Sequence, residues 1–216
     1  DLDLLTESLK NYALQEEELA IDPRKVEGKG TPEQVCHQIE MAMAASTTEA
    51  PQVEYFALAR GETAAPKANI FAALGQCPYL TQVCLEGCSF SEEAADGLQK
   101  LLLSLQLQTL SLRRAPLLPN TLRKLGVGIR ASKSLLTLDV EECGITDHVE
   151  LADIIRSNYS LRSLRIAGKR FQNKIGDLFL AILGARIESL CARRILVNES
   201  LPNDRSIFAR LVEQMV

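Results

Sequence analysis

The chain has 216 residues, of which 35 are leucine and none is tryptophan; charged residues make up 24% and apolar residues 46%. These fractions lie close to the averages for globular proteins, so they exclude a wholly disordered chain, a collagen and a disulfide-stapled miniprotein. No apolar run approaches the eighteen or so residues that a membrane-spanning helix needs, and we expect no membrane insertion.

The net charge of −4 conceals an uneven distribution of charge along the chain. Residues 1–100 carry 17 acidic and 7 basic side chains, whereas residues 101–216 carry 11 acidic and 17 basic ones. Such polarity orients a charged partner, although salt screens exposed charges beyond about 8 Å. Two ordinary solvated faces are the simpler interpretation. No nucleic acid is expected, because the chain is acidic overall and no aromatic residue is interleaved with the arginine pairs.

The cysteine spacing argues against both a disulfide framework and a zinc site. The six cysteines are Cys36, Cys77, Cys84, Cys88, Cys143 and Cys191. No Cys-x-x-Cys motif occurs, and no histidine stands near the one close pair, Cys84 and Cys88. Free thiols are typical of cytoplasmic proteins. We therefore expect a cytoplasmic chain with no metal ion and no cofactor.

Residues 1–52 are predicted to form an N-terminal cap and an irregular first unit. Apolar residues at helical spacing indicate a helix within residues 1–20, and a short strand is expected at residues 19–21. Residues 22–30 contain proline, glycine and lysine and are predicted to be a loop. A helix then follows to about Met43, with Thr31 as its cap and Pro32 at its first position.

Residues 53–172 contain five copies of one apolar pattern, and self-similarity of this kind indicates a repeat architecture. The copies begin 27, 27, 28 and 26 positions apart, at Val53, Leu80, Leu107, Leu135 and Leu161. In each copy two further apolar residues stand three and five positions later, which is the two-residue period of a strand with one buried face.

The stretch after each strand changes to helical periodicity. Residues 91–105 place apolar side chains on one side of a helix that begins at Ser91. Residues 147–157 do the same, with Val149, Ala152, Ile154 and Ile155 as the apolar side chains and Asp147 as the cap. Each unit is therefore a strand, a turn, a helix and a return, and one unit buries its apolar face only by stacking on the next.

Residues 173–216 are predicted to hold the last helix, a degenerate unit and a C-terminal cap. Ile187 stands 26 positions after Leu161 and favours a sixth strand. One continuous helix from Gly176 to the region of Arg193 is the competing interpretation. Residues 204–216 are predicted to form a closing helix.

The period and the cysteine at the turn resemble the leucine-rich repeat of ribonuclease-inhibitor type, over about residues 53–172. The resemblance implies one α/β domain, residues 1–216, in which a curved solenoid has parallel strands on its concave face, helices on its convex face and atypical helical caps. It also implies that Cys88 and Cys143, just after their strands, satisfy backbone groups that turn inward. In the other units this position holds Gly61, Ala115 and Lys169.

Strand alternation places the residues beside each buried leucine on the concave face. Arg113, Asp139 and Arg165 fall at similar heights on adjacent units, where opposite charges pair across strands. A self-neutralised surface and a partner-binding mosaic both stay open. We expect a protein partner to bind this face and the loops after the strands, through Tyr55, Gln82, Glu86, Thr109, Arg113, Arg114, Asp139, Glu141, Glu142, Arg165, Lys169 and Arg170.

Within the leucine-rich class, the chain is similar to the C-terminal domain of tropomodulins and leiomodins, which regulate actin filaments at the pointed end. The likeness rests on residues 1–5 and 8–11, on residues 56–59 and 80–86, and on residues 161–166 and 172–176. It implies a non-catalytic protein-binding module, actin as the first candidate partner and a cytoskeletal location. It assigns no individual residue to an actin contact.

Regulation of a small GTPase is the alternative function. Arg60 follows the first strand of the repeat, where leucine-rich activators of the GTPase Ran carry a catalytic arginine. His37 and His148 have no nucleophile or metal pattern beside them. We therefore assign no catalytic residue, expect a protein that is not an enzyme, and leave the oligomeric state open.

Overall fold

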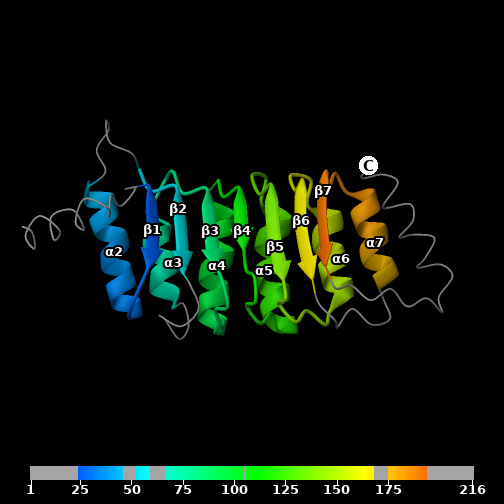
Figure 1. Cartoon of the computed structure of the whole chain (residues 1–216), viewed down its shortest axis with the longest axis horizontal. Coiled ribbons are helices and arrows are strands. Elements are labelled where there is room, and N and C mark those ends of the chain that lie inside the picture. The colour runs from blue at the N-terminus through cyan, green and yellow to red at the C-terminus, as the bar shows by residue number, and fades with distance from the viewer. Residues whose placement is uncertain (1–23, 46–51, 59–66, 105, 168–174, 194–216) are drawn as a thin grey trace, which may run out of the picture.

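The computed structural model describes residues 24–45, 52–58, 67–104, 106–167 and 175–193. Within them, strands and helices alternate, and seven parallel strands form one sheet in chain order (Figure 1). The strands are β1 (Lys25–Gly28), β2 (Tyr55–Leu58), β3 (Gln82–Leu85), β4 (Thr109–Ser111), β5 (Thr137–Glu141), β6 (Ser163–Ala167) and β7 (Ser189–Arg193). The helices are α2 (Pro32–Ala45), α3 (Ala68–Leu74), α4 (Glu92–Ser104), α5 (Pro119–Ala131), α6 (His148–Ser157) and α7 (Ile175–Gly184).

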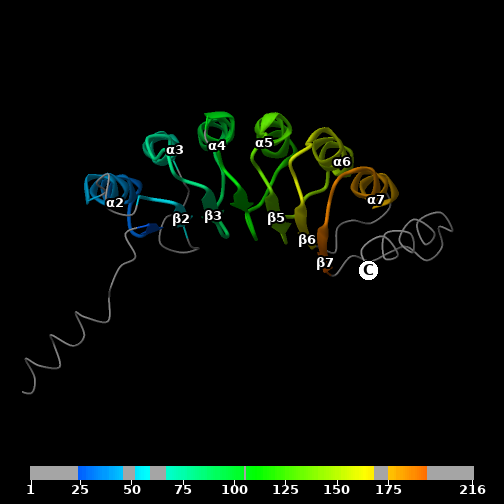
Figure 2. The ribbon, with the colours of Figure 1, turned by 90° about the horizontal axis from the view of Figure 1, so that it is seen from above.

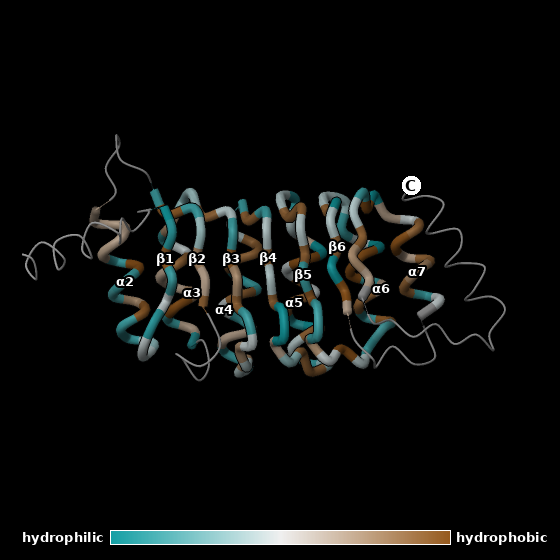
Figure 3. Tube along the Cα trace, in the orientation of Figure 1, coloured by the Kyte–Doolittle hydropathy of each residue, from teal (hydrophilic) through white to brown (hydrophobic). Residues whose placement is uncertain are grey.

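All of these helices lie on one face of the sheet. Seen from above, they form the outer row of an arc and the strands form the inner row, so the other sheet face is concave and uncovered by any described helix (Figure 2). Most helices alternate between hydrophilic and hydrophobic residues along the chain, whereas α7 is mostly hydrophobic (Figure 3). The architecture is therefore an α/β repeat with two layers and one continuous core between them.

The core is built from residues that repeat at the same height in successive strands. One row, aligned by the strand register, consists of Val26, Phe56, Val83, Leu110, Leu138, Leu164 and Leu190. The first six of these side chains are buried and Leu190, on the last strand, is half-buried. Burying one large aliphatic side chain stabilises a fold by about 1.5–3 kcal/mol, so each added unit extends the same source of stability.

Predicted caps begin three of the helices. Thr31 Oγ1 accepts a hydrogen bond from the Gln34 N–H at 3.3 Å, and Gln34 Oε1 accepts one from the Thr31 N–H at 2.8 Å, which is a reciprocal capping box. Ser91 Oγ and Asp147 Oδ1 each accept a hydrogen bond from the backbone N–H three residues later. These contacts confirm Thr31, Ser91 and Asp147 as caps.

Two glycines allow neighbouring helices to approach closely on the convex side. A Cβ on Gly126 of α5 would stand 2.7 Å from Ile154 Cδ1 of α6, and a Cβ on Gly128 would stand 3.1 Å from the Gln99 carbonyl oxygen of α4. The Gly-Val-Gly segment is therefore a packing feature at the centre of three helices.

Asn158 joins consecutive units where α6 returns to the sheet. Its side-chain N–H₂ donates to the backbone carbonyls of Ile129 at 2.6 Å and Ser132 at 3.1 Å, both in the preceding unit. Its Oδ1 accepts from the backbone N–H of Ser160 and of Leu161. A single buried amide thus satisfies backbone groups of two turns that have no strand partner.

Three sequence-based predictions need correction or are now decided. Residues 25–28, predicted as loop, form β1, because Val26 packs into the core and the segment pairs in parallel with β2. The competition in the C-terminal region is decided for a strand, since α7 ends at Gly184 and β7 pairs with β6. Val149 is 50% exposed rather than inward, because the buried arc of α6 is centred on Leu151 and Ile155 and Val149 falls outside it.

Several predicted elements lie outside the described residues: the helix within 1–20, the strand at 19–21 and the closing helix at 204–216. No helix in the described ranges combines the length and the apolar character needed to cross a membrane.

Candidate functional site

The concave sheet face presents polar side chains in aligned rows. The outer row is formed by the first residue of each strand from β2 to β7, and all of its side chains are half-buried or exposed. It consists of Tyr55, Gln82, Thr109, Thr137, Ser163 and Ser189. Neighbouring strands lie about 4.8 Å apart, so this row extends over roughly 24 Å. The structure therefore brings Tyr55, Gln82 and Thr109, predicted as partner-binding residues, onto one continuous surface.

An acid–arginine cluster, defined here as Arg113, Asp139, Glu141 and Arg165, lies further along the concave face. Asp139 and Arg165 stand two positions after Thr137 and Ser163, and Arg113 and Glu141 stand four positions after Thr109 and Thr137. Arg113 Nε lies 3.5 Å from Glu141 Oε2, and Arg165 Nε lies 3.6 Å from Glu141 Oε1. Arg165 Nε also lies 3.6 Å from Asp139 Oδ2, its register partner on β5. The predicted cross-strand pairing of Asp139 with Arg165 is confirmed. Arg113 does not share their height as predicted, because Ser111 is the residue in register with Asp139, and Arg113 pairs with Glu141 instead.

Both carboxylates of the cluster are buried although they lie on the sheet face without helices. Asp139 is 8% and Glu141 2% exposed. Asp139 Oδ1 accepts the Glu141 N–H at 3.0 Å, and Cys191 Sγ donates to Glu141 Oε1 at 3.4 Å. A partner therefore meets the two arginines above these acids rather than the acids themselves.

The environment of Asp139 disfavours its charged form. Burial raises the pKa of the Asp139 carboxyl above its ordinary value, and the neighbouring Glu141 carboxylate adds to the rise. The Glu141 backbone N–H and the guanidinium groups of Arg165 and Arg113 oppose the rise in pKa. Desolvation dominates, so holding this charge in place costs folding free energy at neutral pH.

A second ion-pair system runs along the loops that follow the strands. Arg114 Nη1 lies 3.0 Å from Glu86 Oε1, and Arg114 Nε lies 3.2 Å from Glu142 Oε2. Arg114 and Glu142 both have φ of 58°, a left-handed conformation that Gly87, at the equivalent position one unit earlier, adopts with φ of 66°. Arg114 thus lies within ion-pair distance of an acid from each neighbouring unit.

Buried thiols close the turns beneath these loops. Cys143 Sγ donates to the Leu112 carbonyl oxygen at 2.8 Å, and Cys88 Sγ to that of Leu58 at 3.7 Å, each in the preceding unit. This is the contact that the resemblance implied for both residues. Burial raises the pKa of each thiol to about 12, so both stay protonated donors. All six cysteines are free.

Cys84 is a half-buried thiol of the concave face, in register with Ala57 and Ser111. Burial raises its pKa, and a hydrogen bond with Ser111 opposes that rise. Because the thiolate is the reactive form, this environment does not activate Cys84.

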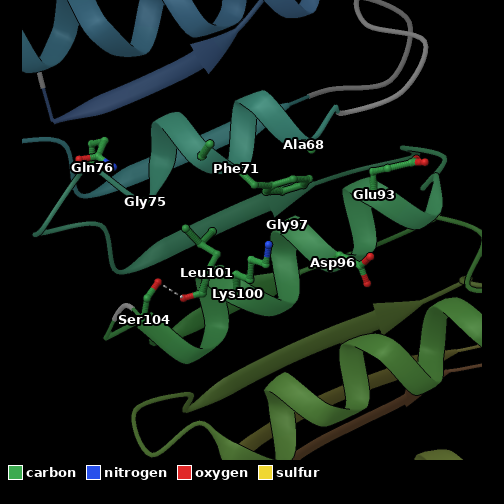
Figure 4. Close-up of a pocket in the computed structure, with 11 residues that line it drawn as sticks. Ala68, Phe71, Gly75, Gln76, Glu93, Asp96, Gly97, Lys100, Leu101 and Ser104 are labelled. Carbon is green, nitrogen blue, oxygen red and sulfur yellow. Dashed lines mark hydrogen bonds between the residues drawn. The ribbon is translucent and has the colours of Figure 1, made fainter.

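A groove of about 560 Å³ lies between α3 and α4 on the convex side. The two helices differ in length, since α3 has 7 residues and α4 has 13. Phe71 lies over Gly97 at its floor, and Asp96 and Lys100 stand at its edge (Figure 4). Phe71 itself is only 2% exposed, so its ring contributes little to the surface of the groove.

The remaining candidates add no chemistry to this face. His37 is exposed on α2 and His148 is buried at the start of α6. Within the described ranges, no three histidine, cysteine or acidic side chains gather as a metal site. Arg60, Lys169 and Arg170 lie outside the described residues.

Cys191 and Glu188 also belong to this region, although the repeat pattern did not predict it. Cys191 contacts Glu141, and Glu188 Oε1 lies 3.3 Å from Arg162 Nε. The only signal was the spacing of Ile187 from Leu161, which also fitted a helix.

A scan against protein-family models and a search of curated proteins both found no match to this chain.

Proposed function

We propose that the chain is a leucine-rich repeat solenoid of ribonuclease-inhibitor type. Three features support this assignment. The repeats of 26–28 residues superpose in strand register. Cys88 and Cys143 donate to carbonyls of the preceding unit. The residue two positions after each of three successive strand leucines or valines is left-handed, at Gly87, Arg114 and Glu142.

Its proposed function is non-catalytic binding of a protein partner through the concave face and the loops after the strands. The observation that carries the proposal is the aligned outer row from Tyr55 to Ser189, a polar surface on rigid strands that no described helix covers. A row of roughly 24 Å has the length of a standard protein interface, which buries about 800 Å² on each partner. Rigid scaffolds commonly present binding residues in this way.

Actin is the first specific partner to test, on the resemblance of residues 56–59, 80–86 and 161–166 to tropomodulins. A pointed-end elongation assay and cosedimentation with filaments measure activity and binding. We expect the wild-type chain to bind and to slow growth at the pointed end. Absence of both effects would remove actin as the partner, and native-lysate affinity capture then supplies a partner for the surface test.

The surface test compares two matched double variants. Gln82→Arg with Thr109→Arg places two bulky charges on the concave row, and Gln76→Arg with Thr121→Arg places the same charges on the convex side. The concave variant should lose partner binding and the convex one should retain it. Equal retention by both variants would show that the partner does not use the concave face.

A further inference from the structure

We propose that Arg113 and Arg165 together receive a carboxylate group from an acidic segment of the protein partner. The inference rests on the proposed function and names the partner's chemistry at one point on the concave face. Its basis is the geometry of the acid–arginine cluster, in which the negative charges lie at the floor and the two guanidinium groups lie at the surface.

The two guanidinium groups converge over one buried side chain. Arg113 approaches Glu141 from the β4 side and Arg165 from β6, and each contacts a different oxygen of the same carboxylate. One strand, β5, lies between β4 and β6, so the backbones that carry the two arginines are separated by about 10 Å. Both Nε atoms lie within 3.6 Å of the Glu141 carboxylate, so the two guanidinium groups lie near each other over β5 and one anionic group can contact both.

The contacts to Glu141 use only part of each guanidinium group. In all three ion pairs the contacting atom is Nε, which is buried and has no hydrogen-bond partner for either arginine. Within the described residues, no hydrogen bond is made by the terminal amines of Arg113 or Arg165. The side chains are 38% and 41% exposed, so their terminal amines are accessible donors for a carboxylate, which arginine binds in bidentate geometry.

Other arginines near the sheet are engaged differently. Arg114 is paired with Glu86 and Glu142 on opposite sides at 3.0 and 3.2 Å. Arg162 donates to three backbone carbonyls and pairs with Glu188. Arg113 and Arg165 are fixed in orientation by buried acids while keeping donors available, which lowers the entropy lost on binding.

The charge balance favours a carboxylate over a phosphate. The cluster contains two arginines and two acids, so it is neutral before a ligand arrives. A singly charged carboxylate adds less repulsion with Asp139 and Glu141 than a phosphate that carries nearly two charges. The occupant we assign is therefore a glutamate- or aspartate-containing segment of a protein.

The direct test titrates the full chain with an end-blocked peptide of alternating glutamate and serine and observes the arginine Nε–Hε signals by NMR. The signals of Arg113 and Arg165 should shift, and the shifts should weaken with added salt. Arg156, an exposed arginine on α6 that pairs with Asp153, serves as the internal control and should not shift. Glutamine in place of glutamate in the peptide should abolish the effect.

Two variants separate binding from folding. Arg113→Lys with Arg165→Lys keeps positive charge over Glu141 but removes the planar fork, so the chain should unfold at nearly the same urea concentration and bind the peptide roughly tenfold more weakly. Arg156→Lys should bind as the wild type does. Equal binding by the Arg113 and Arg165 lysine variant, or equal shifts at Arg156, would overturn the inference.

Two further outcomes distinguish this inference from the proposed function. If a phosphoserine peptide shifts the two signals and the glutamate peptide does not, the carboxylate assignment is wrong. If a captured partner is lost with the Gln82→Arg and Thr109→Arg variant but retained by the lysine variant, the concave face binds and the arginine pair does not contribute. If neither variant affects the partner, both proposals fail.

Discussion

Asp139 and Arg165 face each other in register across β5 and β6, and Arg165 Nε lies 3.6 Å from Asp139 Oδ2. The aspartate is only 8% exposed, so its charge is held where burial opposes it. Only the aspartate of this ion pair is buried, since Arg165 is 41% exposed, and a pair of this kind contributes more to the orientation of the arginine than to stability. Burial of the Asp139 carboxylate lowers the stability of the fold, while the acid–arginine cluster keeps Arg113 and Arg165 in a defined orientation.

Replacement of Asp139 by asparagine should change how stability depends on pH. The folded-state pKa of Asp139 lies above its ordinary value of 3.8, so this group stabilises the fold below that pH and the stabilisation is lost as pH rises through the folded-state pKa. Asp139→Asn keeps an oxygen to accept the Glu141 N–H and does not titrate. The free energy of unfolding of the variant, relative to wild type, should therefore be higher at pH 7 than at pH 4.

Urea unfolding at both pH values measures this difference. Asp153→Asn is the matched control, because Asp153 is exposed on α6 and pairs with Arg156. If the free energy of unfolding of Asp139→Asn, relative to wild type, is the same at pH 4 and pH 7, the prediction is wrong.

Replacement of Glu141 by glutamine should destabilise the fold by about 1–3 kcal/mol, because both arginines lose the carboxylate between them. The loss is smaller than for a fully buried pair, since Arg113 and Arg165 are partly solvated. Glu142→Gln, on the exposed loop, should cost less than about 1 kcal/mol. A double-mutant cycle of Glu141→Gln with Arg113→Gln should be non-additive, and strict additivity would show that the contact carries no energy.

Replacement of Asn158 by alanine should cost about 1–3 kcal/mol, because it removes the partner of the Leu161 N–H in a buried turn and the shorter of the two hydrogen bonds to each of the Ile129 and Ser132 carbonyls, which keep bonds of 3.3 Å from the Ser132 N–H and the Ser160 hydroxyl. Asn120→Ala removes one exposed hydrogen bond to Arg123 and should change stability by less than about 0.5 kcal/mol. Chemical denaturation of the two variants measures the comparison. Similar losses in both would mean that the Asn158 network does not join the units.

Replacement of Gly126 by alanine should destabilise the helix layer. The added methyl group would stand 2.7 Å from Ile154 Cδ1, and Ile154 is fully buried and has little room to move. Overpacking of about 1–3 kcal/mol outweighs the gain of about 0.5–1 kcal/mol in helix propensity. Gly184→Ala in α7 meets nothing within 4 Å and should keep or raise the melting temperature. A stabilised Gly126→Ala chain would contradict the close packing.

The amino-acid sequence alone determines the repeat and most of its elements. The spacing of leucines such as Leu110, Leu138 and Leu164 predicts the strands, because a two-residue period places them on one face and a shared period stacks them in one row. Caps such as Asp147 are equally local, since an aspartate bonds to the N–H three residues later whatever surrounds it.

Only the tertiary structure decides the two end strands and the state of the central acids. The proline, glycine and lysine content of residues 22–30 predicts a loop, yet residues 25–28 form β1 because β2 supplies hydrogen-bond partners and a core for Val26. β7 is likewise formed on β6. Alternation predicts Glu141 on a solvent-facing position, yet it is buried because Arg113 and Arg165, from strands on either side, close over it. Such coverage depends on side chains brought together from different units, which no local pattern records.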